Sequence, residues 1–176
     1  MNNPHLLSHL RSIPDFPIKG INFRDVTTLF NDPESLRIME EEMYEIYKDK
    51  GITKVVGIES RGFVMGAILA RRLGAGLVLC RKPGKLPAET ISVTYGKEYG
   101  SDTIEIHKDS INEDDIVLIH DDLLATGGTV LAALDLVEQL KPRKCYLGFI
   151  IEIRDEGLTG RETIGDRAEI STLITI

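Results

Sequence analysis

The pattern of apolar and polar positions predicts a regular alternation of helices and strands. The first amphipathic helix is expected between Asn31-Asp32-Pro33 and Gly51, because proline favours the first helical position and glycine favours the position after the last turn. Its apolar residues recur at helical spacing, at Leu36, Met39, Met43, Ile46 and Tyr47. This segment therefore predicts a capped helix with one buried face.

Two copies of a strand, helix, strand pattern follow. Strands are predicted at residues 54–58, 77–80, 116–119 and 145–153, and helices at 63–73 and 130–140. Strands that are apolar on both faces belong in a parallel sheet covered by helices. We therefore predict an α/β fold, a single domain over residues 1–176 with a mostly parallel sheet flanked by helices.

The segment at about residues 82–103 interrupts this alternation. It is rich in glycine, proline and lysine and has no helical period. Long segments of this kind inside compact domains are usually lids or binding loops. The alternative is a plain surface hairpin, because residues 90–95 have the composition of a strand. The two interpretations are compatible, since a hairpin can itself be a flexible lid, or hood.

The composition of the chain limits which ligands it can bind and in which cellular compartment it is expected. The chain has 176 residues, 21 Lys plus Arg and 28 Asp plus Glu, hence a formal net charge of −7. A surface that is acidic overall disfavours nucleic-acid binding, and an anionic ligand needs a local excess of positive charge. No apolar run approaches the ~18 residues of a membrane span. Cys80 and Cys145 lie in apolar runs, which favours buried reduced thiols and a cytoplasmic protein without membrane partners.

The candidate chemistry follows the strand predicted at 116–119. Ligands of parallel α/β sheets bind beyond the carboxyl ends of the strands. Here the sequence places an acidic pair and then a Gly-Gly loop that leads into a helix, an arrangement suited to binding phosphate. The acidic pair needs another partner, such as sugar hydroxyls or a divalent cation. A helix cap beside two solvated aspartates is the simpler alternative. The residues concerned are Asp121, Asp122, Ala125, Thr126, Gly127, Gly128 and Thr129.

This acidic pair and loop resemble the phosphoribosyl diphosphate signature of type I phosphoribosyltransferases. Other segments resemble the members of that family that act on adenine; they lie at residues 14–17, 20, 23–25, 59–63, 81–87 and 98–100. The resemblance implies a type I phosphoribosyltransferase-like fold and purine salvage. It implies transfer of the 5-phosphoribosyl group from phosphoribosyl diphosphate to adenine, giving AMP and diphosphate. It further implies Mg²⁺ as cofactor and a homodimer.

The resemblance also assigns phosphoribosyl diphosphate-binding residues. The 5-phosphate is expected on the loop from Ala125 to Thr129. Asp121 and Asp122 are expected on the ribose hydroxyls and on the water shell of Mg²⁺, with no direct metal ligand predicted with certainty. Diphosphate requires cations, and the expected ones are Arg61, Arg81, Lys82 and Lys85, some of them acting across a dimer interface. An ordinary solvated charge cluster is the alternative for these four side chains.

The nucleobase and proton-transfer residues rest more fully on the resemblance. Phe23 and Ile153 are expected to sandwich the purine ring, with backbone groups around Asn22 and Arg24 contacting its edge. Phe23 as a plain core aromatic is the alternative. Glu98 is the expected catalytic residue, because a lid carboxylate that becomes desolvated can exchange a proton with a ring nitrogen. An exposed loop glutamate is the alternative for Glu98.

Two positions depart from the family pattern. His120 stands where valine or isoleucine usually precedes the acidic pair, and we expect it to cap the strand; a polar neighbour for the acidic pair is the alternative. Lys97 stands where leucine usually precedes the lid glutamate. His5 and His9 are four residues apart, but by themselves they are better interpreted as surface histidines than as a metal site.

Two other functions remain open. One is a phosphoribosyltransferase for another purine, namely xanthine, hypoxanthine or guanine, since specificity is a difference of binding energies that one sequence does not display. The other is a non-catalytic regulator that binds phosphoribosyl diphosphate. A DNA-binding regulator should carry an additional basic helical module, and none precedes Ile13.

Overall fold

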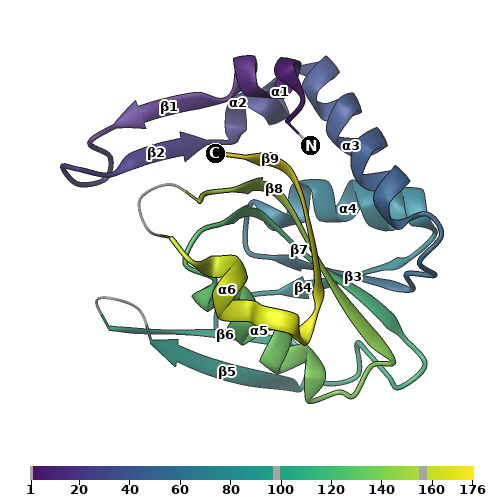
Figure 1. Cartoon of the computed structure of the whole chain (residues 1–176). Coiled ribbons are helices and arrows are strands. Elements are labelled where there is room, and N and C mark those ends of the chain that lie inside the picture. The colour runs from purple at the N-terminus through teal and green to yellow at the C-terminus, as the bar shows by residue number, and fades with distance from the viewer. Residues whose placement is uncertain (1, 97–99, 155–157) are drawn as a thin grey trace.

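A computed structural model describes residues 2–96, 100–154 and 158–176. Its centre is a five-stranded sheet with the strand order β4-β3-β7-β8-β9, in which every neighbouring pair is parallel (Figure 1). The strands of this sheet are β3 (Lys54–Ile58), β4 (Gly76–Cys80), β7 (Ile116–Leu124), β8 (Lys144–Glu152) and β9 (Glu169–Thr175). The predicted α/β class with a parallel sheet is confirmed.

Helices and an antiparallel hairpin cover the two faces of this sheet. Helices α3 (Pro33–Tyr47) and α4 (Gly62–Leu73) pack on one face. Helix α5 (Gly128–Glu138) and the hairpin of β5 (Thr90–Gly96) and β6 (Ser101–His107) pack on the other (Figure 1). The shorter elements are α1 (Pro4–His9), β1 (Arg11–Pro14), β2 (Asn22–Asp25), α2 (Thr27–Asn31), α6 (Gly160–Ile164) and the 3₁₀ turn η2 (Gly165–Arg167).

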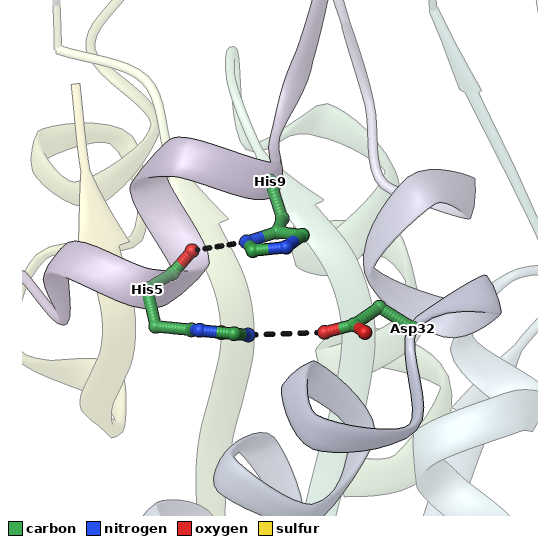
Figure 2. A group of neighbouring side chains, drawn as sticks. All are labelled: His5, His9 and Asp32. Atoms are coloured by element: carbon green, nitrogen blue, oxygen red, sulfur yellow. Dashed lines mark hydrogen bonds and ion pairs between the residues drawn. The ribbon is translucent and has the colours of Figure 1, made fainter.

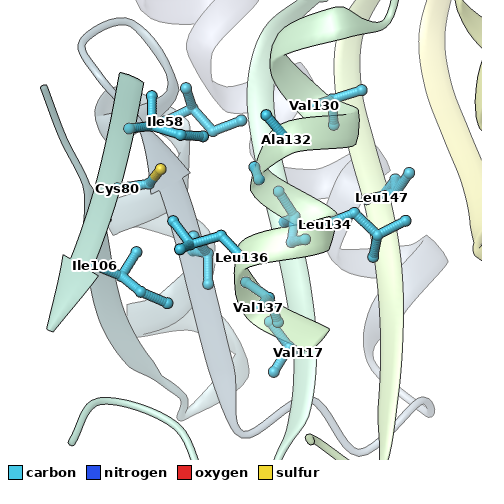
Figure 3. Packing of buried hydrophobic residues seen from close by; sticks show 14 of the residues in the cluster. Ile58, Cys80, Ile106, Val117, Val130, Ala132, Leu134, Leu136, Val137 and Leu147 are labelled. Atoms are coloured by element: carbon cyan, nitrogen blue, oxygen red, sulfur yellow. The ribbon is translucent and has the colours of Figure 1, made fainter. Parts of the chain in front are cut away.

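The alternation of side chains along the strands divides the core into two clusters. In β7, Val117 belongs to the cluster under α5 and Leu118 to the cluster under α3 and α4, and both are fully buried. Figure 3 shows Leu134 and Val137 of α5 packed towards Val117 and its neighbours. Each fully buried side chain of this kind contributes about 1.5–3 kcal/mol relative to an exposed one. The doubly apolar strands of the sequence are thus explained by burial on both faces.

Two helix boundaries follow the caps expected from the sequence. Asp32 is the N-cap of α3, and its side chain accepts the backbone N–H of Ser35 at 2.8 Å. Helix α4 ends at Gly74, which adopts the left-handed conformation with φ of 69°. Helix α3 stops at Tyr47, and turns rather than helix fill residues 48–51. All three predicted helices are confirmed with shifted ends: α3 stops before the expected cap Gly51, and the helix expected at residues 130–140 is α5 at Gly128–Glu138.

Strand β7 differs from its prediction in length and in the place of His120. The strand continues to Leu124, so the acidic pair lies within the sheet rather than in a following loop. His120 does not cap the strand; it is fully buried, and its Nδ1 lies 2.9 Å from the carbonyl oxygen of Gly148. Gly57 and Gly148 pair with His120 on the flanking strands, and Gly66 of α4 lies beside the ring, since a Cβ there would be 3.9 Å from Cδ2 of His120. Burial lowers the pKa of His120 to about 4.

The sequence pattern did not predict the antiparallel ribbon of β1 and β2 or the last strand, β9. It also predicted helices over all of the sheet, whereas the edge strand β4 leaves Leu77 40% and Leu79 36% exposed. Val64 of α4 is 40% exposed as well. These side chains are apolar, so part of the α4 and β4 surface is not covered within one chain.

Two remaining expectations concern thiols and membranes. Cys80 and Cys145 are both free thiols; Cys80 is buried, but Cys145 is partly exposed because it lies near the start of β8. Within the described residues, no helix combines the length and apolar character needed to cross a bilayer.

Candidate active site

The Gly-Gly loop forms a small cradle between β7 and α5. Gly127 is the N-cap of α5 and has φ of 83°, a conformation that glycine adopts without strain. The first N–H groups of the helix have no intrahelical acceptor and point out of its end. Together with the end of β7 they surround a cavity of about 100 Å³. Its lining includes the whole predicted loop, Ala125, Thr126, Gly127, Gly128 and Thr129. This geometry can bind an anion of the size of phosphate.

The acidic pair lies on β7 directly before the cradle. Asp122 is 4% exposed, and its Oδ2 accepts a hydrogen bond from Nε of Arg61 at 2.5 Å. Asp121 is half-buried and lines the cradle. Burial and the neighbouring charge of Asp122 raise the pKa of the Asp121 carboxyl well above its usual range. Ionisation of Asp121 beside the charged Asp122 is therefore disfavoured, although Arg61 is paired with Asp122.

Two of the cations expected at the base of the lid, Arg81 and Lys82, are paired with carboxylates. Nε of Arg81 donates to Glu59 at 3.1 Å, and the backbone N–H of Lys82 donates to the same carboxylate at 2.9 Å. These two contacts hold the pKa of Glu59 below its usual value. The side chain of Lys82 forms an ion pair with Asp102 of β6, while Lys85 is exposed. The fold thus gathers Arg81, Lys82 and Lys85 beside the end of β3.

The hairpin predicted as a lid contacts the cradle directly. The hydroxyl of Tyr95 in β5 lies 3.1 Å from Oγ1 of Thr129, the second residue of α5. Ile91, Val93 and Tyr95 also pack on the core cluster under α5. The hairpin and lid interpretations of this segment are therefore compatible. Glu98 and Lys97 lie outside the described residues.

The start of helix α6 packs directly against the loop that forms the cradle. Gly160 packs so closely on the loop that a Cβ at this position would collide with the carbonyl oxygen of Ala125 and lie 2.9 Å from Leu124. A Cβ on Gly127 would likewise lie 2.9 Å from the carbonyl oxygen of Gly160. The next residue, Arg161, donates from Nε and Nη2 to the buried carboxylate of Glu152, both at 2.8 Å. This two-point ion pair holds α6 against the end of β8.

The predicted nucleobase residues lie on two separate elements. Phe23 of β2 packs edge-to-face on Phe16, with ring centroids 5.2 Å apart, and the guanidinium carbon of Arg61 lies 5.8 Å from its centroid. Ile153 follows β8, donates its backbone N–H to Leu124 at 2.9 Å and packs on the cluster under α3 and α4. Arg61 therefore joins Phe23 to the acidic pair, whereas the sandwich of Phe23 and Ile153 stays a prediction.

The model of the phosphoribosyl transferase domain family matches residues 25–157 of this chain. The chain belongs to the phosphoribosyltransferase family. The adenine phosphoribosyltransferase of Bacteroides thetaiotaomicron is 59% identical over 176 residues, which cover 100% of this chain and 99% of the relative.

Solved structures of phosphoribosyltransferases agree with this assignment. The adenine phosphoribosyltransferase of Rhodothermus marinus is 45% identical with a TM-score of 0.90, and the match covers 98% of this chain and 97% of that one. The enzyme of Giardia lamblia, complexed with 9-deazaadenine, is 42% identical with a TM-score of 0.93, covering 100% and 98%. The type I phosphoribosyltransferase-like fold and the resemblance drawn from the motifs are confirmed.

Four residues that organise this candidate site were not assigned a role from the sequence. Glu59 lies inside residues 59–63, a segment that carries the resemblance, so a role for it in the site could have been predicted from the sequence. Gly160 and the pair of Glu152 and Arg161 gave no local signal, because their partners belong to distant strands and loops.

Proposed function

We propose that this phosphoribosyltransferase transfers the 5-phosphoribosyl group of phosphoribosyl diphosphate to adenine in purine salvage. The products are AMP and diphosphate. The observation that carries the proposal is the Gly-Gly cradle directly after Asp121 and Asp122 on β7, in a chain whose full length matches enzymes named for adenine. The Giardia relative was solved with 9-deazaadenine, an adenine analogue, which supports the same base.

The cradle would bind the 5-phosphate through the backbone N–H groups of Ala125 to Thr129. Asp121 and Asp122 would then hold the ribose hydroxyls. Their oxygens are also the ligand type that Mg²⁺ prefers, and a nearby cation would favour the ionised form of Asp121, which burial and the charge of Asp122 disfavour. When bound, Mg²⁺ would neutralise phosphate oxygens of the substrate. We expect Asp121 and Asp122 to contact it through its water shell.

Diphosphate would leave towards the cations at the base of the lid. As the bond from ribosyl carbon C1 to the diphosphate oxygen breaks, negative charge grows on diphosphate and positive charge on the ribosyl ring. Arg61, Arg81, Lys82 and Lys85 would stabilise the departing anion. In the structure Arg61 is paired with Asp122 and Arg81 with Glu59, so binding diphosphate would require these two guanidinium groups to share or exchange partners.

Adenine would bind between the β1–β2 ribbon and the end of β8. We propose that Phe23 and Ile153 flank the ring and that backbone groups at Asn22 and Arg24 recognise its edge. The ring nitrogen that attacks ribosyl carbon C1 must lose its proton, and Glu98 on the lid is the proposed acceptor. Closure of the hairpin would exclude water from the ribosyl cation.

We also propose that the chain acts as a homodimer in the cytoplasm. The exposed apolar residues Val64, Leu77 and Leu79 on α4 and β4 form a surface that a second copy could cover. The buried free thiol of Cys80 suits a reducing compartment. Sedimentation of the active enzyme tests the dimer: a fully active species at 19.6 kDa would contradict it.

A nucleobase panel tests the activity itself. Purified enzyme is incubated with phosphoribosyl diphosphate, Mg²⁺ and adenine, hypoxanthine, guanine or xanthine in turn, and nucleotide and diphosphate are measured. We expect AMP from adenine at the highest kcat/KM. Preference for another purine would support the alternative transferase. Binding of phosphoribosyl diphosphate without turnover of any base would support a non-catalytic regulator.

A further inference from the structure

Three side chains with metal-binding groups meet outside the active site. His5 and His9 lie one turn apart on α1, and Asp32 lies at the start of α3 (Figure 2). One potential ligand atom from each lies within 4.8 Å of the other two. Residues at positions i and i+4 share a helix face, so the two rings can approach one ion. The spacing of the histidines alone did not support a metal site; the fold adds a carboxylate.

The pair of His5 and Asp32 is already close to the geometry of coordination. Nε2 of His5 lies 3.0 Å from Oδ2 of Asp32. Zinc bonds to nitrogen and oxygen are about 2.0–2.2 Å long, so two ligands of a tetrahedral ion lie about 3.3 Å apart. Asp32 is also fixed in orientation, because its Oδ2 accepts hydrogen bonds from the N–H and hydroxyl of Ser35 at 2.8 and 2.6 Å.

The hydrogen bond of His9 leaves a ligand atom available. Its Nδ1 lies 2.9 Å from the carbonyl oxygen of His5, and a carbonyl oxygen accepts but does not donate. The proton of a neutral His9 ring therefore lies on Nδ1, and the lone pair lies on Nε2. The two rings stack with centroids 4.1 Å apart and an angle of 23° between their planes. A ligand atom of the exposed His9 ring already lies within 4.8 Å of the other two, and on coordination the proton of His5 would leave Nε2 or move to Nδ1.

We propose that His5, His9 and Asp32 bind Zn²⁺ or a similar late first-row divalent cation, with water completing the coordination. Imidazole nitrogen favours such ions, whereas Mg²⁺ favours oxygen ligands. This site is therefore chemically distinct from the proposed magnesium site at Asp121 and Asp122. Its occupation would tie α1 to the N-terminus of α3. Because α1 leads directly into β1, it would also fix the root of the β1–β2 ribbon.

Titration of the full-length chain without an affinity tag tests the site. Isothermal titration with ZnCl₂ and thermal unfolding with and without Zn²⁺ are the two measurements. We expect one Zn²⁺ per chain and a rise in Tm, since an ion that binds the folded state stabilises it. Mg²⁺ at the same concentration should give no such rise through this site. The absence of Zn²⁺ binding by the wild-type chain would overturn the proposal.

Variants separate this site from other zinc-binding positions. His9→Gln and Asp32→Asn should each weaken binding at least about tenfold, since loss of even an outer-shell partner costs about 10–100-fold. Asparagine is as good an N-cap as aspartate, so Asp32→Asn should keep α3 intact. His107→Gln, at the end of β6, is the matched control and should bind Zn²⁺ as the wild type does. Wild-type affinity in both His9→Gln and Asp32→Asn would overturn the proposal.

Discussion

Arg61 donates a hydrogen bond from its Nε to Oδ2 of Asp122 across 2.5 Å, although the two residues are 61 positions apart. The Asp122 side chain is 6% exposed and that of Arg61 is 44% exposed, so a nearly buried carboxylate is neutralised by a half-exposed cation. The same guanidinium lies over Phe23. One side chain therefore links the acidic pair of β7 with the aromatic residue of β2.

Replacement of Arg61 should destabilise the fold by leaving the Asp122 carboxylate unpaired. For Arg61→Gln we expect a loss of about 1–2 kcal/mol in the free energy of unfolding, measured by urea denaturation. Breaking a fully buried ion pair costs about 3–5 kcal/mol, and the loss here should be smaller because Arg61 is half-exposed. Arg61→Lys, which keeps the charge, is the control and should lose less.

A double-mutant cycle measures the coupling energy between Arg61 and Asp122. In Arg61→Gln/Asp122→Asn the unpaired charge is removed, so the double variant should be more stable than the sum of the two single losses predicts. Residues in contact typically show coupling of about 0.5–3 kcal/mol in such cycles. Strictly additive losses would show that the ion pair makes no net contribution.

Gly160→Ala should disturb the phosphate cradle without changing any residue proposed to touch substrate. The added Cβ would collide with Ala125, so the loop must shift. Small displacements of a binding loop are costly, and we expect the KM for phosphoribosyl diphosphate to rise about tenfold or more and Tm to fall.

Gly66→Ala in α4 is the matched control for this substitution. Its Cβ would meet its neighbours at 3.5 Å or more, an ordinary contact. Alanine is favoured over glycine inside a helix by about 0.5–1 kcal/mol, so stability should hold or rise. If Gly160→Ala bound phosphoribosyl diphosphate as Gly66→Ala does, the close packing of α6 would be irrelevant to the cradle.

Glu152 should contribute stability that is lost in acid. Hydrogen bonds from Arg161 lower the pKa of Glu152 from 4.5 in the unfolded chain to about 2 in the fold. Between these two values the unfolded state binds more protons, so stability is complete above about pH 4.5 and falls as pH drops towards 2. The contribution is on the order of 3 kcal/mol.

Denaturation from pH 6 to pH 3 measures this contribution in wild type and Glu152→Gln. The variant should be less stable at neutral pH, and the difference between the two proteins should shrink as pH falls. Glu89→Gln is the control, because the ion pair of Glu89 with Lys108 is exposed and should matter little. A difference that is constant with pH would contradict the lowered pKa of Glu152.

Glu98→Gln tests the proposed proton acceptor on the lid. Glutamine keeps the size of the side chain but does not take up a proton, so kcat should fall by about 10²–10⁴. Binding of phosphoribosyl diphosphate, measured directly by titration, should change little. Equal losses in kcat and in binding would show that Glu98 positions the substrate instead.

Features that depend on residues close together in the sequence were predicted correctly. Asp32-Pro33 and Gly74 mark helix ends through local capping, and the Gly-Gly loop predicts a phosphate site through backbone freedom. Strand β7 was predicted too short, because His120 and the two aspartates are polar and their burial depends on the flanking strands. The residues beside His120, namely Gly57 and Gly148 on the flanking strands and Gly66 of α4, come from elsewhere in the chain.

By itself the sequence determined the α/β class, because helical and strand periodicity alternate along it, and the caps at Asp32 and Gly74 and the Gly-Gly loop, because these depend on contacts within a few residues. The tertiary structure alone decided which distant side chains meet. The register of β3 beside β7 places Arg61 at Asp122, and the return of α6 to the loop places Gly160 on Ala125. Docking of α1 on α3 likewise places Asp32 at His5. Such pairings depend on strand register and helix packing, which no local pattern specifies.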